Sequence, residues 1–318
     1  MTKSQTTVTN KRSFRKLEDL NLIDNFLFQQ MLQQKEDGEE FARILLTTIL
    51  NRPIRKVRIT SQKNILGLDT DKHGIRLDAY IEDVSDSLNP DLADIELVPD
   101  IYDMEPNNTY EKETLPRRTR YYHGLIDTQL LASGLNYSKL PNMIIIVILP
   151  YDPFDKNRMV YTIQNHCIED PSIPYDDGAK KIFLYTKGIE GSPSQELKDM
   201  LKYIEKSTKD NVTNQSIASI QELVDKVKKK KEVGVNYMKS WEMEELARTA
   251  GYKDGFNEGF NDGFNDGFTD GFNDGLNDGI EKMKQLCALL LAAGRTDDLM
   301  KATQDKTYQT ELFKEFNL

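Results

Sequence analysis

The alternation of apolar and polar residues predicts two short helices followed by strands in the first part of the chain. Apolar residues spaced three and four apart fall in residues 22–32 and 41–50, and the charged segment 35–38 is predicted to form a turn between them. Alternation of period two then predicts strands at residues 57–60 and 75–81. The chain therefore changes from helix to strand near residue 51.

The middle of the chain continues the strands and adds one helix. Residues 83–99 are acidic and contain Ser and Pro, which predicts a surface loop before a strand that carries Glu105. Helical spacing is seen in residues 118–131 and again in residues 194–233. Three further apolar segments are predicted to be strands, at residues 143–150, 159–163 and 179–185. Strands with helices outside them are typical of an α/β domain.

These patterns divide the chain into three predicted parts. Residues 1–16 are polar with no apolar period and are predicted to be a disordered arm. Residues 17–240 form the α/β domain, and residues 241–318 form a mostly helical C-terminal region. Only Cys167 and Cys287 are present, and no early segment has the pattern of a secretion signal, so we expect a cytoplasmic protein without structural disulfides.

Residues 251–281 repeat a four-residue unit, most often Gly-Phe-Asn-Asp. Four residues advance an α-helix about 40° past a full turn, so the glycine and aromatic positions form two slowly spiralling stripes. Each glycine disfavours the helix by roughly 0.8–1 kcal/mol relative to alanine. We therefore expect the C-terminal region to self-associate into a homo-oligomer, which would offset this loss. A flexible acidic spacer is the alternative.

The net charge of −10 argues against a general nucleic-acid coat, because non-specific binding depends on Lys and Arg. Residues 251–281 contain eight acids and one Lys, so about −7 of this charge lies in the repeats. Basic clusters at residues 52–58, 117–120 and 226–231 can line a DNA groove or form solvated faces. The apolar run 143–149 is too short to cross a bilayer, and no membrane partner is predicted.

Two acids on neighbouring predicted strands suggest a metal site. Asp78 lies within the predicted strand 75–81. Glu105 lies on the following strand, where Asn107 shares its face. Close carboxylates repel unless a cation lies between them, and hard oxygen ligands favour Mg²⁺ or Mn²⁺. A competing register uses Glu96 in place of Glu105 and has valine at the third position.

Seven segments, in this order, resemble the PD-(D/E)XK nuclease family transposases, also called recombination-promoting nucleases. They are residues 22–28, 76–80, 102–105, 115–122, 126–127, 134–137 and 151–154. The resemblance covers roughly residues 17–240. It implies a restriction-endonuclease-like fold, a mixed β-sheet flanked by helices, and Mg²⁺-dependent cleavage of DNA associated with transposition or recombination.

The resemblance also assigns roles to single residues. Asp78 and Glu105 match the two motif acids that hold the metal. Asn107 falls where the family usually has Gln or Lys to orient the attacking water, and an amide can bind water but is not a cation. Asp24 matches an N-terminal acid that could join the metal site, with a helix N-cap as the alternative.

A basic segment follows the strand that carries Glu105, called here the acid strand. Arg118, Arg120 and Tyr122 match the family, and with Arg117 they could contact DNA phosphates or support the acid strand. Two functions therefore remain at this point. The first is a DNA endonuclease, and the second is a catalytically weakened module, marked by Asn107, that acts in DNA binding or self-assembly.

Overall fold

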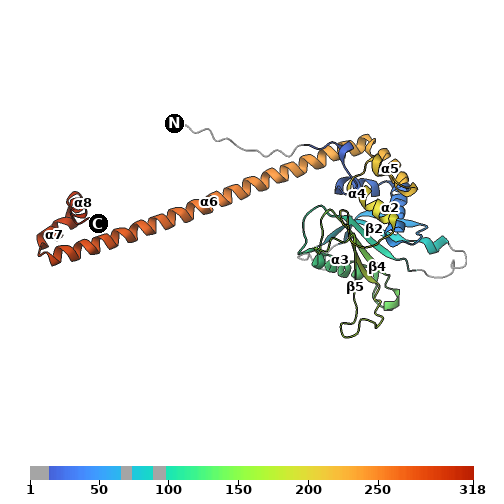
Figure 1. Ribbon diagram of the computed structural model, residues 1–318, viewed down its shortest axis with the longest axis horizontal. Coiled ribbons are helices and arrows are strands. Elements are labelled where there is room, and N and C mark those ends of the chain that lie inside the picture. Colours follow the sequence, from blue (N-terminus) through green and yellow to red (C-terminus); the bar gives the residue numbers. More distant parts are fainter. Residues whose placement is uncertain (1–13, 66–73, 89–97) are drawn as a thin grey trace. The chain divides into compact units, whose positions relative to one another are not determined.

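The computed structural model describes residues 14–65, 74–88 and 98–318 of the chain (Figure 1). It forms two compact units, Met1–Met238 and Lys239–Leu318. The predicted arm lies mostly outside the described residues. Within its described part, the Tyr237 hydroxyl donates to the Arg15 carbonyl at 2.8 Å, so ordered contacts begin before residue 17.

The first unit is built on one sheet. Its strands are β1 (Val57–Ile65), β2 (Ile75–Asp83), β3 (Ile101–Pro106), β4 (Met143–Leu149), β5 (Val160–Gln164) and β6 (Ala179–Tyr185). Across the described residues the strand order is β1-β2-β3-β4-β6-β5. The pairs β3–β4 and β4–β6 are parallel and the other pairs are antiparallel. The sheet is therefore mixed.

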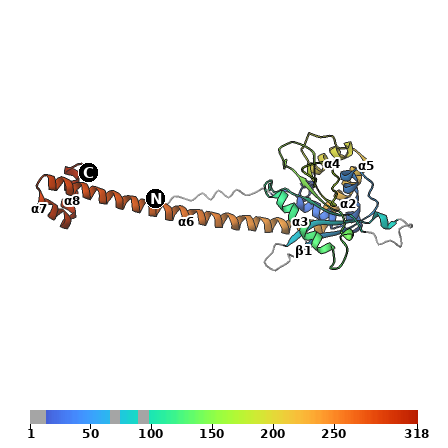
Figure 2. The same cartoon turned by 90° about the horizontal axis from the view of Figure 1, so that it is seen from below.

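Helices cover this sheet. Those of the first unit are α1 (Asn25–Leu32), α2 (Lys35–Leu50), α3 (Leu115–Leu130), α4 (Gln195–Glu205) and α5 (Gln215–Lys228), with short 3₁₀ turns at Leu17–Asp19, Ser85–Leu88, Tyr137–Lys139 and Lys209–Asn211. In Figure 1, α2, α4 and α5 group above the sheet and α3 lies below them, and Figure 2 again shows α4 and α5 together.

Alternate residues of β4 point to opposite faces of the sheet and join two different cores. Ile146 and Ile148 pack in a larger core with α1, α2, α4 and α5. Ile145 and Val147 pack in a smaller core with α3. Because both faces are covered, the central strand is apolar without interruption. The predicted mixed α/β class is confirmed.

The segment 35–38 is helical and not the turn predicted from its charges. α2 begins at Lys35, and Glu36 and Asp37 occupy its first turn, where acids stabilise the exposed amide groups of a helix. Gly38 is required for close packing, since an added Cβ would lie 2.7 Å from the Leu32 carbonyl oxygen. The charges that suggested a break in the helix therefore favour its beginning.

In the second unit, one long helix leads to a small helical cluster. α6 (Lys231–Ala292) starts in the first unit and includes the whole repeat segment, and α7 (Thr296–Gln304) and α8 (Lys306–Glu315) follow it. Leu286, Leu290, Ala302 and Leu312 form the buried centre of this cluster. None of the helices in the described ranges is long and apolar enough to pass through a membrane.

Candidate functional site

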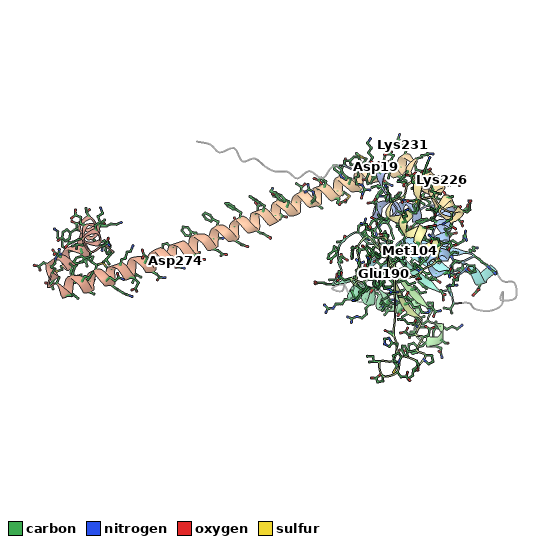
Figure 3. The ribbon with its side chains drawn as sticks, viewed as in Figure 1. Asp19, Met104, Glu190, Lys226, Lys231 and Asp274 are labelled. Atoms are coloured by element: carbon green, nitrogen blue, oxygen red, sulfur yellow. The ribbon has the colours of Figure 1, made fainter. Side chains whose placement is uncertain are left out.

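Three carboxylates gather on β2 and β3. The antiparallel register pairs Tyr80 with Asp103, and continuing it by two residues on each strand brings Asp78 opposite Glu105. Met104, labelled in Figure 3, packs into the larger core, so Asp103 and Glu105 on either side of it point toward the α3 face. Sequence reasoning had paired two of these acids and had missed Asp103.

Asp103 is the most unusual of the three. Its side chain is completely buried, and neither carboxylate oxygen has a hydrogen-bond partner among the described residues. Burial raises the pKa of Asp103 well above its ordinary range, and the nearby Glu105 and Asp78 raise it further. Its position two residues before Glu105 on the same strand face was the available signal.

Glu105 is held by an arginine from the next helix. The side chain of Arg118 on α3 donates from Nη2 to Glu105 Oε1 at 2.8 Å and from Nη1 to Glu111 Oε2 at 2.5 Å. Burial is the largest influence and raises the pKa of Glu105 to about 7, despite the opposing effect of Arg118. Asp78 and Glu111 contribute in the same direction as burial. The ion pair thus only partly offsets the removal of this acid from water.

The basic segment on α3 is divided between the site and the solvent. Arg118 faces the acids, and its guanidinium lies 5.9 Å from the centre of the Tyr122 ring. Burial, followed by the charge of Glu105, raises the pKa of Tyr122 to about 12. Arg117 and Arg120 are exposed. Arg118 therefore supports the acid strand in this structure, whereas its two neighbours are accessible to a ligand.

Asp78 is oriented by two glutamines that sequence reasoning missed. Gln29 of α1 donates from Nε2 to Asp78 Oδ1 at 2.7 Å, and Gln62 of β1 donates to Gln29 Oε1 at 3.4 Å. Burial raises the pKa of Asp78, while the Gln29 hydrogen bond and the charges of Arg76 and Arg118 act in the opposite direction. Gln29 could have been noticed as a polar residue in a predicted apolar helix, whereas Gln62 lies beyond the predicted strand 57–60, because β1 continues to Ile65.

The backbone is strained directly across from Asp78. Gln62 has a φ of 52°, in the left-handed region that side-chain-bearing residues rarely adopt. The ladder pairs Ser61 with Ala79 but omits the next position, where Gln62 would face Asp78. Such strain is frequent at functional sites, because the surrounding structure must maintain it. It interrupts the regular alternation of β1 and β2 beside the acid.

Asp24 is engaged elsewhere. Its carboxylate accepts from Arg15 Nη1 at 2.9 Å and Nη2 at 3.0 Å, and from the Asn21 amide at 2.7 Å. It occupies the N-cap position of α1 without a side-chain capping hydrogen bond. The structure therefore shows neither the capping contact nor a contact with the acid pair. The helix that begins here contributes Gln29 to the site instead.

Asn107 closes the turn after β3. Its Oδ1 accepts from the Thr109 amide at 2.9 Å, and its Nδ2 lies 3.5 Å from Glu111 Oε2. The side chain is only 5% exposed. This is the geometry of an Asx turn, in which the amide holds the local backbone. The competing acid, Glu96, lies outside the described residues.

Replacing Asn107 with Ala is expected to lower the free energy of unfolding by roughly 1–2 kcal/mol, because the Thr109 amide would lose an acceptor held by a buried side chain, and the buried space of that side chain would be left empty. Asn136 makes the matched contact to the Ser138 amide at 2.9 Å on an exposed turn. Asn136→Ala should cost less than about 0.5 kcal/mol, since water can replace the lost acceptor. Urea denaturation of both variants measures the difference, and equal losses would contradict the structural role of Asn107.

The donor set suits a hard divalent cation. Within residues 14–65, 74–88 and 98–318, no group of three or more His, Cys, Asp or Glu side chains is arranged to hold a metal ion. Mg²⁺, however, keeps several waters and is usually bound through one or two carboxylates and the substrate phosphate. Asp78 and Glu105 supply hard oxygens, and the buried carboxyl of Asp103, which has no hydrogen-bond partner among the described residues, lies beside them. The residues present therefore fit Mg²⁺ or Mn²⁺.

Three comparisons bear on the family of this chain. Known protein families, curated proteins and solved structures give no match. The functional interpretation depends, for this reason, on the geometry of Asp78, Asp103 and Glu105 and on the order of the sequence motifs.

Proposed function

We propose that the first unit is a metal-dependent DNA endonuclease of the PD-(D/E)XK type, associated with transposition or recombination. The observation that carries this proposal is the group of Asp78, Asp103 and Glu105 on the adjacent strands β2 and β3, with Asp103 buried and without a hydrogen-bond partner among the described residues. Buried charges without partners are strongly unfavourable, so such an arrangement is maintained where a cation or catalysis requires it. The mixed sheet with helices on both faces is consistent with a restriction-endonuclease-like fold.

In this proposal Asp78 and Glu105 hold the metal, and their neighbours fix the direction of each carboxylate. When bound, Mg²⁺ polarises the scissile phosphate and stabilises charge on the leaving oxygen. Gln29 orients Asp78 through its 2.7 Å hydrogen bond, and Arg118 orients Glu105 through its 2.8 Å ion pair. Asn107 is assigned to positioning water, although its Oδ1 already accepts from Thr109.

Exposed cations near the acids supply contacts for the DNA backbone. Arg76 lies two residues before Asp78 on β2, and Arg117 and Arg120 flank Arg118 on α3. All three are exposed, and arginine binds phosphate oxygens in a bidentate manner. These contacts would hold the duplex over the acid pair without reading its sequence.

A second function is favoured by the contacts of Asn107 and Glu105. The Asn107 carboxamide accepts a hydrogen bond within a turn, and Glu105 already pairs with Arg118. A protein with this site could bind DNA or assemble without cutting it. This alternative keeps the fold and the exposed arginines and removes only the catalytic role of the acids.

Nicking of supercoiled plasmid by the full chain tests the two functions. The endonuclease predicts nicked and linear products with Mg²⁺ or Mn²⁺, none with EDTA, and none from the double variant Asp78→Asn, Glu105→Gln. Fluorescence anisotropy with labelled duplex and Ca²⁺ measures binding in parallel. Binding without cleavage in any of these metals would favour the second function, and cleavage by the double variant would reject the proposed site.

A further inference from the structure

The repeat segment of α6 presents an uncovered row of aromatic rings. Five phenylalanines at every fourth position have exposed fractions between 61% and 67%: Phe256, Phe260, Phe264, Phe268 and Phe272. Successive ring centres are 6.3–6.4 Å apart and the rings are nearly parallel. Figure 3 shows side chains projecting from this part of the helix, where Asp274 is labelled. A continuous apolar surface of this kind is typical of an interaction site.

No contact with another described part of the chain requires glycine at these repeat positions. Apart from its chain neighbours and the nearby backbone of the same helix, an added Cβ would meet no described atom within 4 Å at any of the eight positions, which are Gly251, Gly255, Gly259, Gly263, Gly267, Gly271, Gly275 and Gly279. Each nevertheless disfavours the helix by roughly 0.8–1 kcal/mol relative to alanine. The row of small residues therefore leaves space beside the helix that no other described part of the chain fills.

We propose that α6 pairs in parallel with α6 of a second copy of this chain, so that the phenylalanines of each helix lie over the glycines of the other. Phe follows Gly by one residue, or about 100° around the helix, and a contact line midway between them faces both rows. In a parallel two-fold pair, the Phe side of one helix meets the Gly side of its partner. An antiparallel pair would instead oppose Phe to Phe and Gly to Gly, which gives a clash beside a gap.

The charges of the repeat are compatible with this contact line. Asp lies three residues after Gly, which puts it about 110° from the contact line, and Asn lies about 150° from it. The acidic side chains of both copies therefore remain in water. Their mutual repulsion acts through solvent and is screened by salt. Association should accordingly become tighter as ionic strength rises, which is the opposite of an interface held by ion pairs.

The period of the repeat fixes the handedness of the pair. Rows at every fourth residue drift about 40° per repeat and complete a turn in roughly 54 Å of helix. A period longer than 3.6 residues gives a right-handed winding. Packing of such rows crosses at roughly 40–50°, the arrangement in which small residues allow close approach of two backbones. The Gly and Phe rows therefore stay in contact along the repeat when the two helices wind about each other.

The exposed aromatic area is sufficient for a stable pair. A Phe side chain buries roughly 150–250 Å² when fully covered. Five that are more than 60% exposed therefore offer on the order of 600 Å² per copy, or about 1,200 Å² for two. This reaches the lower range of specific, stable interfaces, before Leu276 and Ile280 at the end of the row are added.

Sedimentation equilibrium of the full chain between about 1 and 50 µM tests the pair, with helicity followed by circular dichroism. Gly263→Ala with Gly267→Ala should increase helicity, because alanine favours the helix. The same substitutions should weaken the dimer at least roughly tenfold, because the added methyl groups occupy the space that the partner's Phe rings would fill. Asn261→Ala with Asn265→Ala is the matched control, since it raises helicity on the outer side and should leave the dimer constant unchanged. A monomer throughout the concentration range, or a dimer tightened by the glycine substitutions, would overturn the proposal.

Spin labels decide the direction. Cysteines placed at Asn257 or Asn277, in a background where Cys167 and Cys287 are replaced by Ser, each put one label on the outer side of each helix, at the same height along the pair when the helices are parallel. The parallel pair predicts short label separations at both positions. Long separations at both positions would indicate an antiparallel pair and would reject the packing of Phe over Gly.

Discussion

Asp78→Asn is expected to lower the rate of Mg²⁺-dependent plasmid nicking by about three orders of magnitude or more. The substitution removes one negative charge from the metal site, while Asn keeps an oxygen that can accept from Gln29 Nε2, now 2.7 Å from Oδ1. Loss of a metal ligand removes several kcal/mol of transition-state stabilisation, and each 1.36 kcal/mol is about tenfold in rate. Initial nicking rates at saturating Mg²⁺ measure the effect, and unchanged thermal unfolding shows that the variant is folded.

Two other acids provide controls for this prediction. Glu82→Gln changes a carboxylate on the same strand that faces Arg58 at 3.4 Å, and the nicking rate should stay within about threefold. Asp24→Asn alters an acid that pairs with Arg15, and activity should likewise be retained. Loss of activity in Asp24→Asn with activity retained in Asp78→Asn would show that a different set of acids performs the reaction.

The relation between the two acid strands could be predicted from the sequence because it depends on local patterns. Alternation predicts the strand of Asp78, and the two-residue spacing of Glu105 and Asn107 puts them on one face of the next strand. Consecutive strands usually pair, so acids on these two strands are expected to lie close together, and the antiparallel register brings Asp78 opposite Glu105 when it is continued two residues past Tyr80 and Asp103. The motif resemblance then separated Glu105 from other nearby acids.

The surroundings of these acids depend on contacts that sequence periodicity does not contain. Gln29 reaches Asp78 from 49 residues away, because α1 packs on the sheet beside β2. Asp103 was visible as a polar residue, but its complete burial results from the packing of α3 and the neighbouring strands. The engagement of Asn107 in a turn likewise depends on where β3 ends. Local pattern therefore located the acids, whereas their electrostatics required the tertiary structure.

Asp103→Asn is expected to stabilise the metal-free protein at pH 8 and to change its stability little at pH 4. The folded-state pKa of Asp103 lies well above that of the unfolded chain, because burial and the charges of Glu105 and Asp78 disfavour ionisation. The folded protein therefore binds more protons than the unfolded chain above about pH 4. Stability falls as pH rises through this window, and an uncharged side chain of the same shape avoids the loss.

Glu105 causes a second loss of stability as pH rises, and Asp103→Asn does not remove this loss. Its pKa is raised to about 7, so its unfavourable contribution develops between pH 4.5 and about 7 and amounts to roughly 3 kcal/mol. Thermal denaturation of wild type and Asp103→Asn in EDTA from pH 4 to 8 should give curves that separate as pH rises. Asp83 is the matched control, because its carboxylate accepts a hydrogen bond from the Ser85 amide at 3.0 Å and forms an ion pair with Arg52 at 3.4 Å. Asp83→Asn should therefore destabilise the protein, opposite in sign to Asp103→Asn.

Addition of Mg²⁺ connects this stability effect to the proposed site. A cation bound near the acids stabilises the folded protein in proportion to the logarithm of its concentration over its dissociation constant. Wild type should gain stability from millimolar Mg²⁺ at pH 8, because a nearby cation favours release of the Asp103 proton, and Asp103→Asn should gain less because Asn has no proton to release. A variant that is less stable than wild type in EDTA at pH 8 would mean that the Asp103 carboxylate is satisfied without a cation. In that case the buried charge would no longer support a metal-dependent function.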